Sequence, residues 1–260
     1  MNAFRTKDVY LFLDYDGTLT PIVSEPELAF LPVDMRDILT ELFDLYPVSI
    51  VTGRGRQVIS HFLGDELLSK VSLAASHGFD IHMTDGQYLH VSDHSHQEQF
   101  SRFKCELNQE LARFPPGCAL EENKYTVTVH FRHADPADHP AVEASLDALL
   151  VQYPGLVKRG GKMVFEARLD MAWNKGKAVE WILSKSCSRS PNDCLVVYIG
   201  DDMTDEDAFD TLKGYPHHLS VIVAGDENLD RPTAAEYRLR DQSDVIKFLR
   251  KLIELNTACL

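Results

Sequence analysis

The stretch LFLDYDGTLT, residues 11–20, decides the fold of this chain. Its first three residues complete the apolar run of residues 9–13. Two aspartates, Asp14 and Asp16, and then Gly17 follow this run. A short apolar run followed by turn residues is typical of a buried parallel strand that ends in a functional loop. Asp14 is therefore expected at the carboxyl end of a strand, where open α/β sheets bind their ligands.

Strand-like and helical segments alternate toward both ends of the chain. Apolar spacing predicts helices over residues 33–46, 57–63, 177–183, 206–212 and 243–255, and apolar runs predict strands over 47–51, 73–75, 194–199 and 219–223. The Asp-Gly pair at 85–86 predicts a hairpin between strands 80–83 and 88–91. Strands that alternate with helices predict an α/β fold, a doubly wound parallel sheet of the Rossmann-like type.

The middle of the chain has a different pattern. Its expected elements are helices over residues 97–114 and 141–153 and strands over 118–120, 126–131 and 163–169. Residues 126–131, TVTVHF, alternate polar and apolar side chains, which indicates an antiparallel strand with one wet face. We therefore assign residues 93–171 to a smaller inserted α/β cap domain, and residues 1–92 and 172–260 to the core.

Composition excludes several classes of protein. The 260 residues are 44% hydrophobic and 25% charged, as in ordinary soluble domains. A net charge of −14 argues against general nucleic-acid binding, and no segment approaches the ~18 to 20 apolar residues of a membrane span. Five scattered cysteines without CxxC spacing suggest neither a disulfide framework nor a zinc site, so a reducing, cytoplasmic compartment fits.

The two aspartates of the opening stretch carry the first chemical signal. A carboxylate at Asp14 can attack phosphorus and form an acyl-phosphate that water later cleaves. A second carboxylate at Asp16 can protonate the leaving alkoxide. The alternative is that both residues only form a turn, because Asp and Gly are favoured in loops. Three further motifs weigh against that alternative.

Two of these motifs supply groups that suit a phosphate. Thr52, Gly53 and Arg54 follow the second strand, with a hydroxyl and a glycine that lets the backbone approach a phosphate closely. Lys175 begins a helix and offers an ammonium group, which offsets the charge that accumulates when a carboxylate attacks a phosphate dianion. Taken singly, an ordinary strand-to-helix turn and a solvated lysine are the alternatives.

The third motif is GDDMTDED, residues 200–207, which follows another apolar strand. Hard oxygen ligands suit Mg²⁺, which bridges one or two carboxylates to a phosphate. The alternative is an acidic helix N-terminus, where the helix dipole favours Asp and Glu. We combine the two interpretations and assign functional roles to Asp201 and Asp205 and dipole roles to the other acids.

Together these four segments resemble the haloacid dehalogenase superfamily of phosphatases, whose motifs are DxDG[TS], a strand-terminal Ser or Thr, a lysine, and GDxxxD. All four occur in the expected order. The resemblance implies Asp14 as the nucleophile and Asp16 as general acid and then base. It implies Thr52 and Lys175 as ligands of the phosphoryl group.

The same resemblance implies a metal site for Mg²⁺. Its ligands would be the carboxylates of Asp14 and Asp201 and the backbone carbonyl of Asp16. Asp205 belongs to the same acidic set and would orient Lys175 or a metal-bound water.

The chain resembles one family of this superfamily in particular, the trehalose-6-phosphate phosphatases. The matching stretches are LDYDGTLTPI (13–22), VTGR (51–54), SHGF (76–79), ExKYTxTxHFR (122–132), GKMVFEARL (161–169) and NKGKA (174–178). The resemblance implies Mg²⁺-dependent hydrolysis of trehalose 6-phosphate to trehalose and phosphate through an aspartyl-phosphate. Phe79 stands where a glutamate often follows HG in this family.

Charged residues of the cap are the candidates for binding the sugar. Paired acidic and basic side chains are the usual way to bind the many hydroxyls of a disaccharide. The substrate-binding candidates are Gly53 and Arg54 of the core and Glu122, Lys124, Arg132, Lys162, Glu166 and Arg168 of the cap. Surface ion pairs on the cap strands are the alternative. His77 and His130 are expected to be structural rather than catalytic.

Other functions remain open at this point. The enzymatic alternatives are a phosphatase for another sugar phosphate, such as glucosyl- or mannosyl-phosphoglycerate, and a hexose phosphomutase with the same type of cap. A catalytically silent sugar-phosphate sensor would be expected to lack an acid at Asp14, Asp16 or Asp201, and all three are present. We expect a cytoplasmic monomer that acts on a small-molecule sugar phosphate, with a functional link to a trehalose-6-phosphate synthase.

Overall fold

The computed structural model describes residues 8–91, 94–161, 163–187, 190, 193–225 and 231–257. The chain divides into two compact units. Unit 1 consists of Met1–His90 and Trp173–Leu260, and unit 2 consists of Val91–Ala172.

Unit 1 contains an eight-stranded sheet with the order β12-β11-β10-β1-β2-β3-β4-β5. Its strands are β1 (Val9–Leu13), β2 (Val48–Val51), β3 (Ser72–Ala75), β4 (Asp80–His82), β5 (Tyr88–His90), β10 (Leu195–Gly200), β11 (His218–Val223) and β12 (Tyr237–Leu239). The strands from β12 to β3 are parallel, and β4 and β5 continue the sheet as an antiparallel hairpin. The predicted α/β fold with a parallel sheet is confirmed, and the Asp-Gly hairpin forms its antiparallel edge.

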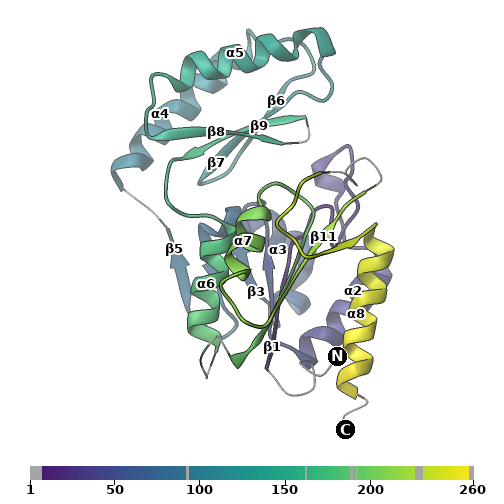
Figure 1. The fold of residues 1–260 in the computed structure, drawn as a ribbon. Coiled ribbons are helices and arrows are strands. Elements are labelled where there is room, and N and C mark those ends of the chain that lie inside the picture. The colour runs from purple at the N-terminus through teal and green to yellow at the C-terminus, as the bar shows by residue number, and fades with distance from the viewer. Residues whose placement is uncertain are drawn as a thin grey trace. The chain divides into compact units, whose positions relative to one another are not determined.

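Helices cover both faces of this sheet (Figure 1). One face packs against α2 (Val33–Leu45), α3 (Arg56–Leu68) and α8 (Gln242–Thr257), and the other against α6 (Lys175–Ser186) and α7 (Glu206–Leu212). Along β1, Leu11 and Leu13 join the first core while Tyr10 and Phe12 join the second. A strand buried on both faces is apolar throughout, which explains the run that opens the first motif. Two short 3-10 helices, η1 (Pro26–Leu28) and η2 (Ser76–Gly78), complete the described elements of unit 1.

Unit 2 is a four-stranded antiparallel sheet with the order β6-β7-β9-β8, and two helices pack on one of its faces (Figure 1). Its elements are α4 (His94–Leu111), β6 (Ala119–Glu122), β7 (Thr126–His130), η3 (Pro136–Asp138), α5 (His139–Leu150), β8 (Leu156–Gly161) and β9 (Val164–Leu169). Val127 and Val129 of β7 share a core with Phe103 of α4 and Leu146 of α5. The alternation seen in TVTVHF therefore places the valines toward the helices.

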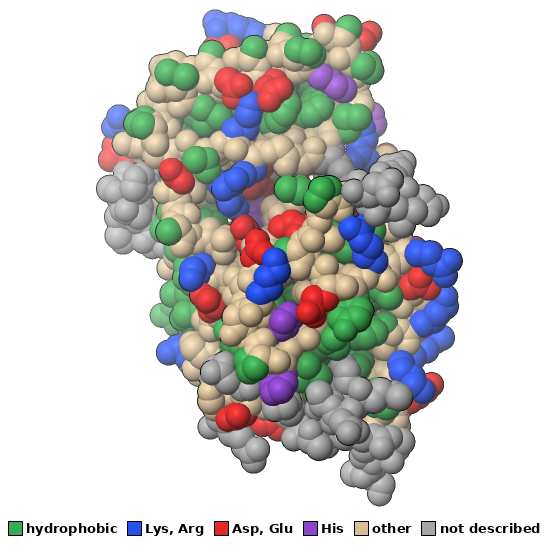
Figure 2. Space-filling model, viewed as in Figure 1, with side chains coloured by type: hydrophobic (Ala, Val, Ile, Leu, Met, Phe, Trp, Pro, Cys, Tyr) green, Lys and Arg blue, Asp and Glu red, His purple; other side chains and the backbone are tan. Residues whose placement is uncertain are grey.

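The described surface carries charges of both signs. Figure 2 shows basic side chains along α8, and these form exposed ion pairs one turn apart, Lys247 with Asp244 and Lys251 with Glu254, each at 2.8 Å. Ion pairs between exposed side chains add little to stability, so they mark a solvated helix face. Among the described helices, none combines the length and the apolar character that crossing a membrane requires.

Candidate active site

Three neighbouring strands of unit 1 end at one edge of the sheet, each followed by a candidate residue. Asp14 follows β1, Thr52 follows β2 and Asp201 follows β10, and these strands are adjacent in the order β10-β1-β2. Hydrogen bonds continue one residue past two of the strands, from Asp14 N to Ile199 O and from Thr52 N to Ala74 O, both 2.9 Å. All three candidate residues are buried. The parallel topology thus brings together groups that lie far apart in the sequence.

Lys175 lies between two carboxylates. Its Nζ is 2.8 Å from Asp14 Oδ1 and 2.8 Å from Asp205 Oδ1, and all three side chains are buried. The lysine is the first residue of α6, whose start is fixed by Asn174, because the Asn174 side chain accepts a hydrogen bond from Lys177 N. Burial alone would lower the pKa of Lys175, but the carboxylates of Asp14 and Asp205 raise it well above its usual range. Lys175 is therefore a fixed positive charge beside Asp14.

The electrostatics around Asp14 show what its ionisation requires. Burial raises the pKa of Asp14 well above its ordinary value, Lys175 opposes that rise, and the carboxylates of Asp205 and Asp201 add to it. A carboxylate nucleophile must be ionised. Asp14 therefore depends on neighbouring positive charge, which Lys175 supplies, to act as a nucleophile.

Asp205 organises the surrounding loop. Its Oδ1 accepts hydrogen bonds from Lys175 Nζ and, at 2.6 Å, from the hydroxyl of Tyr198. Its Oδ2 accepts from the backbone N–H groups of Asp201 at 3.0 Å and Asp202 at 2.9 Å. Burial, with the Asp205 carboxylate adding to it, raises the pKa of Tyr198, so the phenol stays a donor. Both oxygens of Asp205 are thus engaged, which favours its orienting role over direct metal ligation.

The residues fit a hard divalent cation. Carboxylate oxygens of Asp14, Asp201 and Asp205 lie within 4.8 Å of one another and all three residues are buried. Gly17 has a φ of +79°, and a Cβ at this position would lie 2.1 Å from Asp201 Oδ2, so only glycine leaves room for that carboxylate. The buried Thr18 Oγ1 has no hydrogen-bond partner among the described residues. Clustered carboxylates suit Mg²⁺ and its bound water.

Arg54 has a partner that the sequence does not reveal. Its Nε and Nη2 donate to Asp16 Oδ2 and Oδ1 at 2.6 and 2.7 Å, and its Nη1 donates to Pro26 O at 2.9 Å. Its guanidinium lies 4.8 Å from the ring centroid of Phe62. The backbone N–H of Arg54 also donates to Thr52 Oγ1 at 3.1 Å. Sequence reasoning placed Arg54 with the substrate, and the structure brings it to the carboxylate of Asp16.

His77 supports the loop after β2. A Cβ at Gly53 would lie 2.7 Å from His77 Cε1, so the ring occupies space that a larger residue at Gly53 would need. His77 has a φ of +56°, and its backbone N–H donates to Thr52 O at 2.8 Å. In unit 2, His130 Nε2 lies 3.0 Å from Glu121 Oε2 on the neighbouring strand. These contacts favour structural roles for both histidines.

Two of the predicted sugar-binding residues share one face of the sheet in unit 2. Glu166 and Arg168 lie on β9, opposite Thr128 and Thr126 of β7. Ala167 of β9 joins the core that contains α4 and α5. Because side chains alternate along a strand, Glu166 and Arg168 lie on the face away from these helices.

Glu122 lies on the other face of that sheet. It pairs with Val127 in the register of β6 and β7 and contacts α4, with Lys104 Nζ at 3.4 Å and the Asn108 side-chain amide as a hydrogen-bond donor. The structure therefore does not group Glu122 with Glu166.

The remaining cap candidates lie between strands. Lys124 lies in the β6–β7 turn, with its Nζ 5.0 Å from the ring centroid of Tyr125, and Arg132 is exposed after β7. Lys162 lies outside the described residues.

Comparison with known proteins decides the family. The family model described as trehalose-phosphatase matches residues 12–243. The chain belongs to the trehalose-phosphatase family. It is 33% identical to trehalose-phosphate phosphatase B of Arabidopsis thaliana, over 98% of this chain and 68% of that protein. It is 35% identical to a probable trehalose-phosphate phosphatase 2 of Oryza sativa subsp. japonica, over 97% of this chain and 70% of that protein.

Solved structures agree with this assignment. A trehalose-6-phosphate phosphatase related protein is 25% identical, with a TM-score of 0.77 over 96% of this chain and 99% of its own. A haloacid dehalogenase-like hydrolase from Bacteroides thetaiotaomicron shares the fold, with a TM-score of 0.64 at 14% identity over 95% of this chain and 100% of its own. The predicted resemblance is confirmed, and as a member of the trehalose-phosphatase family the chain is a phosphoric monoester hydrolase.

Proposed function

We propose that this chain hydrolyses trehalose 6-phosphate to trehalose and phosphate and uses Mg²⁺ as its cofactor. The observation that carries the proposal is the buried contact of Lys175 Nζ with Asp14 Oδ1, at 2.8 Å, beside the carboxylate of Asp201. This contact lies at the carboxyl ends of parallel strands in a member of the trehalose-phosphatase family.

Asp14 is the proposed nucleophile. Its carboxylate attacks phosphorus, the bond from phosphorus to the sugar oxygen breaks, and an aspartyl-phosphate forms on Asp14. Lys175 offsets the negative charge that gathers on the phosphoryl oxygens. The hydroxyl of Thr52, whose oxygen accepts from Arg54 N, can donate to one of these oxygens. Water then attacks the phosphorus of the aspartyl-phosphate, releases phosphate and restores Asp14.

Asp16 is the proposed proton carrier. It gives a proton to the sugar oxygen as that oxygen leaves, and it takes a proton from the water that attacks in the second step. Arg54 holds both oxygens of Asp16, so we assign it as a positioning residue for this carboxylate. Proton transfer requires Asp16 to give up part of that ion pair when substrate is present.

Mg²⁺ would be held by the carboxylates of Asp14 and Asp201, together with the backbone carbonyl of Asp16 that the superfamily resemblance implies. When bound, it would offset the charge of the phosphoryl group and favour the ionised form of Asp14. Asp205 would act through the Lys175 ammonium and through the backbone of Asp201, which it holds by hydrogen bonds.

We assign unit 2 as the cap that selects the sugar. Glu166 and Arg168 support this assignment, because they supply an acid and a base on one face of its sheet, beside the hydroxyl of Thr128. Such mixed polar groups suit a ligand with many hydroxyls.

The setting of the reaction is a further part of the proposal. The five cysteines are scattered and lack CxxC spacing, so we propose a reducing compartment such as the cytoplasm. We infer a monomer there with a functional link to a trehalose-6-phosphate synthase, since such an enzyme makes the proposed substrate.

A substrate panel tests the proposal. Phosphate release is measured from trehalose 6-phosphate, glucose 6-phosphate, sucrose 6-phosphate and glucosyl-phosphoglycerate, each with Mg²⁺ and with EDTA. We expect kcat/KM to be highest for trehalose 6-phosphate and to need Mg²⁺. A preference for another member of the panel would overturn the substrate, and isomerisation of a hexose phosphate that needs a bisphosphate activator would indicate a mutase.

A further inference from the structure

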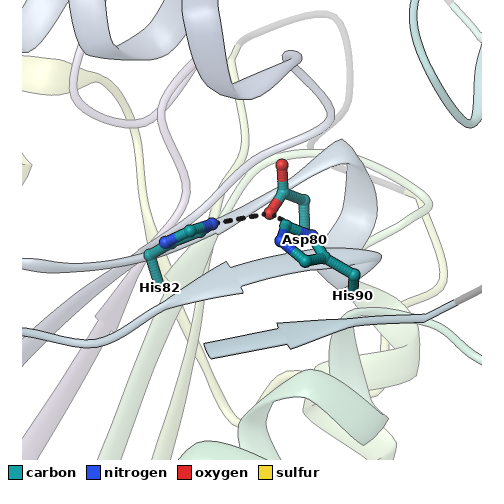
Figure 3. Close-up of side chains that lie close together, drawn as sticks. All are labelled: Asp80, His82 and His90. Carbon is teal, nitrogen blue, oxygen red and sulfur yellow. Dashed lines mark ion pairs between the residues drawn. The ribbon is translucent and has the colours of Figure 1, made fainter. Parts of the chain in front are cut away.

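Asp80, His82 and His90 form a side-chain cluster in unit 1 that the proposed chemistry does not use. Asp80 and His82 are two positions apart on β4, so their side chains point to the same face of the sheet. His90 of β5 pairs directly with Asp80. Residues directly opposite each other on antiparallel strands bring their Cβ atoms to about 4.5 to 5.5 Å. The hairpin thus places one carboxylate and two imidazoles on one face (Figure 3).

The distances within the cluster are close to those between the ligands of a metal ion. Asp80 Oδ1 lies 3.0 Å from His82 Nε2 and 2.9 Å from His90 Nδ1, and Figure 3 shows both rings pointing at this oxygen. The three ligand atoms all lie within 4.8 Å of one another. Metal–nitrogen bonds of about 2.0 to 2.1 Å at a tetrahedral angle separate two ligands by about 3.4 Å. Side-chain movements of a few tenths of an ångström to about one ångström would bring the three ligand atoms to the separations that a bound ion requires.

The facing atoms lack other partners. Asp80 Oδ1, His82 Nε2 and His90 Nδ1 are buried, and within the described part of the chain none of them has a hydrogen bond of acceptable geometry. The Asp80 residue itself is only 7% exposed. Apart from their contacts with one another, the three buried atoms have no polar partner among the described residues, and a shared cation would satisfy all three at once.

Arg56 fixes the orientation of the Asp80 carboxylate. Arg56 Nε lies 3.3 Å from Asp80 Oδ2, which leaves Oδ1 for the histidines. Such outer contacts orient metal-binding carboxylates.

We propose that Asp80, His82 and His90 form a second metal site, which takes a divalent first-row transition ion such as Zn²⁺ or Co²⁺. Two imidazole nitrogens and one carboxylate suit such ions, whereas Mg²⁺ prefers oxygen ligands alone. The His82 and His90 side chains are 35% and 32% exposed, so solvent can supply the remaining ligand. Bound there, the ion would cross-link β4 and β5 at the sheet edge.

This site is distinct from the proposed Mg²⁺ site. Strand β4 lies three positions from β1 in the sheet, and strands are spaced about 4.8 Å apart, so about 14 Å of sheet separates them. Its three ligands come from one hairpin, and Asp14 and Asp201 contribute nothing to it.

Co²⁺ binding to the full chain tests the site, because Co²⁺ absorbs visible light in a way that reports its ligands. The Asp201→Asn variant serves as the background, since it weakens the core site. Equilibrium dialysis after EDTA treatment should find one equivalent of Co²⁺ with visible bands of a four- or five-coordinate ion. Adding His82→Gln and His90→Gln should weaken that binding by at least about 10- to 100-fold, the loss seen when even an outer partner of a ligand is removed.

A matched control and a second readout keep the test decisive. His130→Gln in the same background removes an ion-paired histidine elsewhere and should leave Co²⁺ binding unchanged. Zn²⁺ should raise the thermal midpoint of the background protein and not that of the double histidine variant. If the double variant does not fold, as judged by circular dichroism, His90→Gln alone is used. Equal Co²⁺ binding with and without the two histidines, or no Co²⁺ binding in the background, would overturn the proposal and leave a pair of His–Asp ion contacts.

Discussion

Arg54 donates hydrogen bonds to both carboxylate oxygens of Asp16, from Nε to Oδ2 at 2.6 Å and from Nη2 to Oδ1 at 2.7 Å. This contact joins the TGR motif after β2 to the DYDG motif after β1. Because Arg54 is itself held by Pro26 O and by the ring of Phe62, it can fix the direction in which Asp16 points. A bidentate arginine–carboxylate pair fixes the orientation of the carboxylate, whereas a lysine ammonium does not.

Arg54→Lys should therefore impair proton transfer more than binding. We expect kcat for trehalose 6-phosphate to fall about 10- to 100-fold, because a misplaced catalytic group costs on that order. For para-nitrophenyl phosphate, whose leaving group needs little protonation, the loss should be much smaller. In the Asp16→Asn background, Arg54→Lys should add little, since the two residues act as a unit. Arg240→Lys, at an exposed arginine, is the control. An equal loss on both substrates would show that Arg54 serves the phosphate rather than Asp16.

Asp14→Asn should abolish turnover and leave the fold intact, because the amide keeps the shape of the side chain and loses the nucleophile. Steady-state phosphate release should fall below a few per cent of wild type, with an unchanged circular dichroism spectrum. Asp8→Asn, at the exposed residue just before β1, should keep full activity. Substantial turnover by Asp14→Asn would rule out Asp14 as the nucleophile.

Lys175→Met should lower stability as well as activity. Removing the ammonium leaves the buried carboxylates of Asp14 and Asp205 facing each other without compensation, and breaking a buried pair in this way costs about 3 to 5 kcal/mol. Urea unfolding in EDTA measures the change. Lys177→Met removes an exposed lysine of the same helix and should change the free energy of unfolding by less than about 0.5 kcal/mol. Equal stability of the two variants would contradict the electrostatic role assigned to Lys175.

Asp201→Ala should raise the Mg²⁺ concentration needed for half-maximal activity by at least about tenfold, since it removes a proposed ligand. Chelation should abolish wild-type activity and added Mg²⁺ should restore it. Asp202→Ala, at the next acid along the chain, is the matched control and should keep the Mg²⁺ requirement of wild type. Full activity in excess EDTA would refute the metal assignment.

The parts of the fold that the sequence predicts are those with a strong local signal. Strands β1 and β10 are apolar on both faces, so their runs are unmistakable, and α7 spans residues 206–212 as expected. The predicted helix 57–63 ends directly before Gly64, whose φ of +73° is not helical, and α3 resumes after this break and continues to Leu68. The convergence of Asp14 with Thr52 and Asp201 follows from topology once the strands are known.

Two strands give no usable signal. In β8, Lys158 occupies the helix-facing side and its Nζ pairs with Glu143 at 2.7 Å and Asp147 at 2.6 Å on α5, so the apolar alternation expected of a strand is broken. Strand β12 has three residues, too few for a pattern to appear. Both are edge strands, whose pairing depends on contacts made elsewhere in the chain.

Contacts that depend on register are also beyond the sequence. The cluster of Asp80, His82 and His90 requires the exact pairing of β4 with β5, and one residue of slip would place His90 on the other face. The same holds for Glu122, which the family motif singles out but which the register of β6 turns toward α4. A motif locates such a residue in the chain and leaves its face undetermined.

This division between the faces of unit 2 leads to a prediction about specificity. Chemistry is assigned to unit 1 and sugar selection to unit 2, so the two should be separable. Glu166→Ala and Arg168→Ala should each lower kcat/KM for trehalose 6-phosphate by about 5- to 150-fold, because each lost polar contact to the sugar can cost on the order of 1 to 3 kcal/mol. Their activity on para-nitrophenyl phosphate, which has no second sugar, should be nearly unchanged.

Glu122→Ala and Lys124→Ala complete the comparison. Glu122 contacts Lys104 and Asn108 of α4, so we expect Glu122→Ala to lower the thermal midpoint and to have only a small effect on kcat/KM. Lys124 lies in a turn and its loss should act on trehalose 6-phosphate alone if it binds the sugar. Both substrates and the thermal midpoint are measured for all four variants. If Glu166→Ala and Arg168→Ala reduce activity on the two substrates in parallel, these residues support the fold or the core site, and unit 2 is not the selector.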